Sequence, residues 1–237
     1  MLVEDRDGSR RTCTLTTTLD VHKPFQPKAG ASPWPPGSTL LHVYAVPDWS
    51  DPHHQELLDL VTGISKVLDA AKVPIRPVPR RWLHLTIDQI AVPTASISQE
   101  DRDRLIAELR SRLAALPPVE VQIGSALSYP TGVICDVHPD KELAAMHAVV
   151  QDVVRDVLGA EAATYPWSPP HLTLGYAHAE TDNDALQRRL RRVRPSHATL
   201  RLNALDLVDV SANTGGSAPT ITWHEVASLP LHTGPAS

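Results

Sequence analysis

Residues 82–87 read Trp-Leu-His-Leu-Thr-Ile, and residues 170–174 read Pro-His-Leu-Thr-Leu. Each stretch is a His-Leu-Thr-aliphatic sequence inside a short apolar run, which predicts a strand. Successive side chains of a strand point to opposite faces, so His84 shares a face with Thr86, and His171 shares one with Thr173. The aliphatic residues between them would anchor each strand in a core. Two such strands brought together would form a groove with two imidazoles and two hydroxyls, a set that suits acid–base chemistry on a phosphodiester.

The composition limits which binding partners and which cellular compartment we expect for the protein. The chain has 237 residues, of which 42% are hydrophobic, enough for one large domain or two small fused lobes. A net charge of -5 argues against a broadly basic surface for duplex DNA, but it leaves room for a nucleotide or an RNA end in a local pocket. No apolar run is long enough to cross a bilayer, and no apolar signal core follows the charged N-terminus. We therefore expect a cytoplasmic protein that has no membrane partner.

The two cysteines, Cys13 and Cys135, form neither a disulfide framework nor a zinc knuckle. Cys135 lies in an apolar run and is predicted to be a buried free thiol. The remaining histidines have no ligand-type spacing, so we expect no metal site. They include His138, His178, His197 and His224.

Twenty-two prolines, many at the edges of apolar runs, predict many short elements with sharp joints. We expect residues 1–37 to be a tail, disordered or draped over the body, residues 38–228 to form one bilobal domain, and residues 229–237 to be a second tail. Apolar periodicity and end signals predict the elements inside the domain. The expected helices are 51–71, 98–115, 140–158 and 182–193, and the expected strands are 39–46, 81–90, 119–127, 132–137, 171–177, 197–210 and 220–227.

The order of these elements suggests an internal repeat. The unit "helix, motif strand, helix, two strands" occurs twice, and the two motif histidines are 87 residues apart (171 − 84). Two lobes of similar build, related by a pseudo-two-fold axis, would place the motifs face to face.

Paired His-x-Thr-hydrophobic motifs on strands resemble those of the two-histidine (2H) phosphoesterases, which include the bacterial 2′-5′ RNA ligase / RNA 2′,3′-cyclic phosphodiesterase group. The resemblance spans about residues 40–226 and includes the opening strand, Leu-His-Val-Tyr-Ala-Val-Pro at 41–47. It implies an α+β, bilobal fold with two pseudo-symmetric lobes, each an antiparallel sheet with flanking helices, around a central groove. It further implies chemistry without a metal or other cofactor. The residues it identifies are a catalytic pair, His84 and His171, and two phosphate-binding hydroxyls, Thr86 and Thr173.

The chain departs from this family at one position. Some RNA-processing relatives carry an arginine just after the second motif, where this chain has Gly175-Tyr176. Either the substrate differs, or an arginine such as Arg80 or Arg81 substitutes for the missing cation.

Several further residues are candidates for the groove. Tyr44, on the opening strand, either lines the groove or packs in the core, and the sequence favours neither alternative. Trp82 shares a face with His84, so it would stack on a base or pack at the lobe edge. Trp167 precedes the second motif, and a structural role is favoured over contact with a base. Alternation puts Tyr176 on the leucine face, which predicts packing. The arginines at 188–194 are most simply a solvated helix end, with RNA contact the lesser alternative.

These observations predict a metal-independent phosphodiesterase that acts on 2′,3′-cyclic phosphates or 2′-5′ linkages of RNA or nucleotides. One imidazole would act as base and the other as acid, and we favour His171 as the base. The alternatives are a nuclease for cyclic or 2′-5′ oligonucleotide signals, and a non-catalytic nucleotide- or RNA-binding module. The expected partner is a nucleotide or an RNA end. The sequence gives no oligomeric state, and a monomer is the default expectation.

Overall fold

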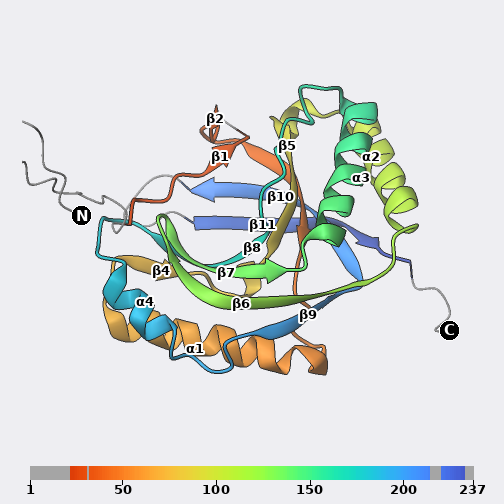
Figure 1. Ribbon diagram of the computed structural model, residues 1–237. Coiled ribbons are helices and arrows are strands. Elements are labelled where there is room, and N and C mark those ends of the chain that lie inside the picture. Colours follow the sequence, from red (N-terminus) through yellow and green to blue (C-terminus); the bar gives the residue numbers. More distant parts are fainter. Residues whose placement is uncertain (1–21, 31, 214–219, 233–237) are drawn as a thin grey trace, which may run out of the picture.

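Two antiparallel sheets, each built from strands far apart in the sequence, form the body of the molecule (Figure 1). The computed structural model describes residues 22–30, 32–213 and 220–232. The four-stranded sheet has the order β11-β10-β3-β5, and the five-stranded sheet has the order β4-β8-β7-β6-β9. The first sheet consists of β3 (Thr39–Ala45), β5 (Leu85–Pro93), β10 (Ala204–Asn213) and β11 (Thr220–Pro230). The second consists of β4 (Ile75–Pro77), β6 (Val119–Tyr129), β7 (Gly132–His138), β8 (His171–Ala177) and β9 (Ala198–Leu202).

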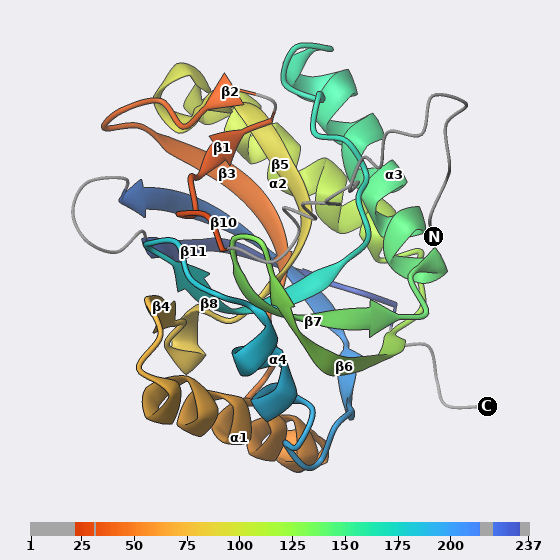
Figure 2. The same ribbon diagram turned by 60° about the vertical axis from the view of Figure 1, so that its left-hand side comes forward.

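Each sheet is covered on its outer side by two helices (Figures 1 and 2). Helices α2 (Gln99–Leu113) and α3 (Lys141–Leu158) pack on the four-stranded sheet, and α1 (Gln55–Ala71) and α4 (Asp184–Leu190) pack on the five-stranded sheet. This arrangement confirms the predicted α+β, bilobal class. Short 3₁₀ turns and a two-residue strand pair complete the secondary structure of the described residues: Pro52–His54, Arg80–Trp82, Thr94–Ser96, β1 (Lys28–Ala29) and β2 (Ser32–Pro33).

Three helix ends lie at the residues that their sequence signals indicate, whereas α4 is shorter at both ends than the expected helix 182–193. The Asp51 carboxylate accepts a hydrogen bond from the His53 amide, and Pro52 occupies the first position of the 3₁₀ turn that leads into α1. The Ser98 hydroxyl caps α2 by accepting from the Asp101 amide. Gly159 ends α3 with a φ of 95°, a conformation that glycine adopts without strain.

The chain crosses between the two sheets, so the lobes do not correspond to the two halves of the sequence. One expected strand, 197–210, is wrong as a single element, because the structure divides it into β9 and β10, which lie in different sheets. No proline or glycine marks the division. The buried positions nevertheless change phase there, from Leu200 and Leu202 to Leu205 and Leu207. The short strand β4 was not predicted, because prolines surround it.

The described part of the N-terminal segment lies against the body, the second of the two alternatives expected for it. Its Phe25 ring stacks on Tyr176 at a centroid distance of 4.3 Å, and Trp34 is buried. Residues 1–21, and with them Cys13, lie outside the described residues. At the other end, β11 extends to Pro230 and Leu231 is buried, so residues 229–231 belong to the domain rather than to a tail.

Two further expectations concern the state of Cys135 and the presence of membrane-spanning segments. Cys135 is a buried free thiol, as predicted, and burial raises its pKa to about 12. In the part of the chain that the structure describes, no helix combines the length and the apolar character that crossing a membrane requires.

Candidate active site

One cavity, between the inner faces of the two sheets, is lined by residues of both motifs. Its volume is ≈ 380 Å³, and we refer to it as the motif cavity. Strand β5 contributes Thr86, with His84 just before it, and strand β8 contributes His171 and Thr173. The two strands come into contact where the sheets meet. The tertiary structure therefore brings together two pairs of side chains that lie 87 residues apart in the sequence.

The alternation of side chains along the strands explains why these four residues face the same space. Leu83, Leu85 and Ile87 are fully buried in the core under the outer helices, and so is Leu172. Their polar neighbours must then point to the opposite, inner face. The aliphatic half of each motif thus holds the strand in place, and this leaves the imidazole and the hydroxyl for the cavity.

Each motif imidazole is held by a backbone carbonyl two residues before it. The His84 Nδ1 donates to the Trp82 carbonyl oxygen at 2.9 Å, and the His171 Nδ1 donates to the Pro169 carbonyl oxygen at 3.2 Å. A carbonyl oxygen only accepts hydrogen bonds, so Nδ1 carries the hydrogen in both rings. Nε2 is therefore the ring nitrogen through which each histidine can exchange a proton.

The surroundings of His84 keep its imidazole neutral. The Tyr44 ring stacks on it at a centroid distance of 3.8 Å, and Trp223 meets it edge-on at 4.9 Å. Burial among these rings lowers the pKa of His84 to about 4, against an opposing effect of the bond to Trp82 and with a smaller repulsion from His171. The His171 side chain is exposed. The two imidazoles thus have different environments in one cavity.

One sequence-family model spans both motifs. A sequence model described as the 2′-5′ RNA ligase superfamily matches residues 52–214, more than half of the chain. The chain belongs to the 2′-5′ RNA ligase superfamily. This membership confirms the resemblance to the 2H phosphoesterases, whereas no curated protein matches the chain significantly.

Solved structures of similar fold include TT0787 of Thermus thermophilus, which is 20% identical, with a TM-score of 0.56 over 81% of this chain and 97% of that one. E. coli LigT in its apo form is 14% identical, with a TM-score of 0.52 over 83% of this chain and 99% of that one. The same protein complexed with 3′-AMP is 16% identical, with a TM-score of 0.52 over the same shares. At these identities the likeness shows a shared fold.

Of the three aromatic candidates from the sequence, only Tyr44 lines the motif cavity. It lies opposite Thr86 in the β3–β5 register. Trp82 lines a smaller cavity next to it, and its ring meets Trp223 edge-on at 4.8 Å. Trp167 is not among the lining residues and instead lies 5.4 Å from the ring of His147, on the side of α3.

A β-bulge follows the threonine in each motif strand of this superfamily member. Ile87 has no partner in the β3–β5 register, and Leu174 has none in the β7–β8 register. Because a bulge inserts one residue, it reverses the alternation beyond it. Gln89 and Tyr176, each three residues after the motif threonine, therefore line the motif cavity. The predicted packing role of Tyr176 is confirmed, because the residue is buried and stacks on Phe25, but the predicted leucine face was wrong for this reason.

Other lining residues were missed because only tertiary contacts bring them to the cavity. The Gln89 side chain accepts from the Gly30 amide at 2.6 Å and donates to the Lys28 carbonyl at 2.8 Å, and these bonds hold the N-terminal segment over the cavity. No local pattern in that segment signals this contact. His42 is different, because its alternation with Tyr44 on the opening strand could have identified it. The remaining unpredicted lining residues include Phe25, Trp34 and Tyr165.

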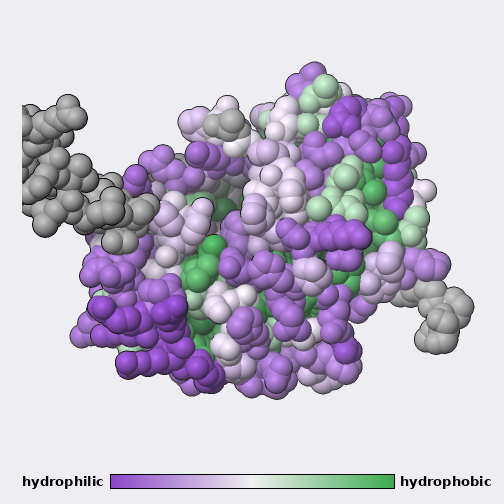
Figure 3. Space-filling view, in the orientation of Figure 1, coloured by the Kyte–Doolittle hydropathy of each residue, from purple (hydrophilic) through white to green (hydrophobic). Residues whose placement is uncertain are grey.

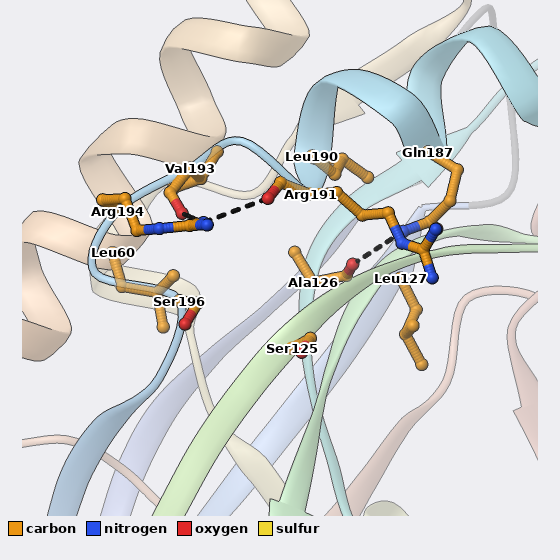
Figure 4. A pocket seen from close by; sticks show the side chains of 10 residues that line it. All are labelled: Leu60, Ser125, Ala126, Leu127, Gln187, Leu190, Arg191, Val193, Arg194 and Ser196. Atoms are coloured by element: carbon orange, nitrogen blue, oxygen red, sulfur yellow. Dashed lines mark hydrogen bonds between the residues drawn. The ribbon is translucent and has the colours of Figure 1, made fainter.

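A larger cavity, of ≈ 520 Å³, lies beneath α4 and contains neither motif (Figure 4). Its walls are mostly apolar, and the Arg194 guanidinium there donates to the carbonyl oxygens of Val193 and Arg191. The Gln187 side chain likewise donates to the Ala126 carbonyl. The surface over α4 and the adjacent end of α1 is strongly hydrophilic, in agreement with a solvated arginine cluster at 188–194 (Figure 3). Volume alone therefore does not identify the site.

Across 22–30, 32–213 and 220–232, no group of three or more His, Cys, Asp or Glu side chains could hold a metal ion.

Proposed function

We propose that the protein is a metal-independent phosphodiesterase that acts on 2′,3′-cyclic phosphates or 2′-5′ linkages of RNA or nucleotides. The observation that carries this proposal is the motif cavity, which is lined by two histidines and two threonines and in which each imidazole is held through Nδ1, leaving Nε2 for proton exchange. Membership in the 2′-5′ RNA ligase superfamily supports it. So does the fold shared with E. coli LigT, which has been crystallised with 3′-AMP and with NADP⁺.

The different surroundings of the two imidazoles support a division of roles. His84 is neutral at neutral pH, because its pKa is lowered to about 4, and its Nε2 lone pair can take the proton of an attacking water. The water oxygen bonds to phosphorus while one bond from phosphorus to a ribose oxygen breaks. His171, on the exposed side, gives its Nε2 proton to that leaving oxygen. Burial of His84 thus favours the reverse of the assignment expected from the sequence, where His171 was the base.

The two threonines complete the proposed chemistry. Negative charge builds on the non-bridging oxygens of the phosphate during attack, and hydroxyl donors held beside them stabilise it. Thr86 and Thr173 line the cavity next to their histidines and are held by strands rather than by loops. The product of a cyclic phosphate is then a phosphomonoester on one ribose oxygen.

The direct test is a substrate panel of four 2′,3′-cyclic nucleotides and of 2′-5′ and 3′-5′ dinucleotides, each assayed with and without EDTA. We expect turnover of the cyclic phosphates or the 2′-5′ dinucleotides, no turnover of the 3′-5′ dinucleotides, and full activity in EDTA. Loss of activity in EDTA would contradict the proposed mechanism. Tight binding of a nucleoside monophosphate without any hydrolysis would instead favour the binding-module alternative.

The lowered pKa of His84 predicts an unusual pH profile. kcat/KM reports the free enzyme, and the base must be unprotonated, so on the acid side kcat/KM should stay high until the pH drops through about 4. An unperturbed imidazole would give that limb near the ordinary histidine value of 6.5. The measurement is kcat/KM from about pH 3 to pH 9, with circular dichroism at each pH to show that the protein stays folded. An acid limb close to 6.5 would exclude His84 as the buried base.

A further inference from the structure

A second cavity opens beside the motif cavity, and Trp82 is its largest side chain. We call it the Trp82 cavity, and its volume is ≈ 240 Å³. It shares two lining residues, Tyr176 and Ile221, with the motif cavity, so the two spaces are neighbours along one wall. Its walls combine apolar surface from Val78 and Trp82 with two cationic side chains, Arg76 and Arg81.

The charges of the two arginines are not used in ion pairs within the described part of the chain. Among the described residues, neither Arg76 nor Arg81 forms an ion pair with a carboxylate. Arg76 lies opposite Tyr176 in the β4–β8 register, at the boundary between the two cavities. The Arg81 guanidinium lies over the Trp82 ring, 5.2 Å from its centroid. Two unpaired cations and an aromatic ring are the groups that bind a phosphate and a base.

The backbone links the Trp82 cavity to the proposed chemistry. The carbonyl oxygen of Trp82 holds the His84 imidazole at 2.9 Å, while the indole of the same residue lines the adjoining cavity. A group bound against Trp82 would therefore lie next to the motif cavity. The position after the second motif holds Tyr176, which carries no charge. Lys28 is the cation that lines the motif cavity, and Arg76 and Arg81 line the Trp82 cavity.

We propose that the Trp82 cavity is a second nucleotide subsite, so that the preferred substrate is an oligonucleotide rather than a mononucleotide. This inference rests on the proposed function and names its substrate class. The terminal cyclic phosphate lies in the motif cavity. The neighbouring phosphate lies against Arg76 and Arg81, and its base packs on the wall of Trp82 and Ile221.

The test compares adenosine 2′,3′-cyclic phosphate with a diadenosine dinucleotide that ends in the same cyclic phosphate. We expect kcat/KM for the dinucleotide to exceed that for the mononucleotide on the order of tenfold, as a charge-assisted contact to one extra phosphate allows. The ratio should fall toward one in Arg76→Ala and in Arg81→Ala, and with rising salt. A wild-type ratio near one, or a ratio that neither substitution changes, would overturn the proposal.

The matched control is Arg80→Ala. Arg80 is exposed and adjacent in sequence, but its guanidinium lies over Trp49 at 5.9 Å and it lines neither cavity. The Arg80→Ala variant should keep the wild-type ratio of kcat/KM for the two substrates. If its ratio fell as much as in Arg76→Ala and Arg81→Ala, the preference would arise from the overall positive charge of this region, and this result would also overturn the subsite.

An equilibrium measurement separates failure of the subsite from failure of the proposed function. Binding of 3′-AMP and of the 3′-phosphorylated diadenosine dinucleotide can be followed by calorimetry without any turnover. If the protein hydrolyses nothing, the subsite still predicts that the dinucleotide binds on the order of tenfold tighter, and that Arg81→Ala removes this difference. Equal affinities for the two ligands would contradict the subsite whatever the outcome of the activity assay.

Discussion

Replacing His84 or His171 by alanine should lower kcat/KM on the substrate found by the panel by about 10³-fold, because each substitution removes one of the two proton-transfer groups. The proposed base and acid act in one step, so the double substitution should cost far less than the product of the two single effects. Both rings line the motif cavity, and each is held in place by one backbone carbonyl. The measurement is steady-state kinetics on the two single variants and the double variant.

His178→Ala is the matched control for this experiment. His178 follows strand β8 directly, is exposed, and lines neither of the two neighbouring cavities. It should keep wild-type activity. Because His84 is buried, thermal melting of each variant should accompany the kinetics, so that a loss of activity in a folded protein is distinguished from unfolding. Full activity in a folded His84→Ala variant would end the acid–base proposal.

Gly132→Ala should reduce the free energy of unfolding by at least about 3 kcal/mol, because a methyl group there combines backbone strain with a steric clash. Gly132 has a φ of 154°, and a Cβ on it would run into the carbonyl oxygen of Gly175. That carbonyl belongs to β8, two residues after Thr173, so the strand can yield only by moving the second motif. Urea denaturation monitored by circular dichroism measures the change.

Gly37→Ala separates the two causes. Gly37 also has a positive φ, of 70°, but a Cβ there would meet nothing within 4 Å. Its substitution should cost only the left-handed backbone conformation, about 1–2 kcal/mol. If Gly132→Ala were no more destabilising than Gly37→Ala, the close approach of β7 to β8 would not be a constraint on the fold.

The helices were predictable because their ends depend on neighbouring residues. Asp51, Ser98 and Gly159 each act within a few positions of the chain, and the structure has them in the capping roles that the sequence indicates. Strand β8 was also predicted with its observed bounds, His171–Ala177. The first motif strand was less well predicted, because residues 80–82 form a 3₁₀ turn and the strand itself runs from Leu85 to Pro93.

The pairing of strands was harder to predict from the sequence than the helices were. Residues 197–210 carry an uninterrupted strand pattern, and only the sheets with which each part pairs divide them into β9 and β10. The bulges at Ile87 and Leu174 likewise exist only because the neighbouring strands set a register that skips one residue. A pattern of alternation contains no information about the partner strand, so it placed Tyr176 on the wrong face.

The sequence by itself determined the family, the two motif strands and the polar face of each motif, because strand periodicity and the paired His-x-Thr motifs are local properties. Only the tertiary structure decided which residues surround the motifs. In the structure Tyr44 stacks on His84, Gln89 and Tyr176 point into the cavity, and Phe25, Lys28 and Trp34 line it as well. These contacts join residues far apart in the chain. They depend on sheet register and on burial, and burial also lowers the pKa of His84.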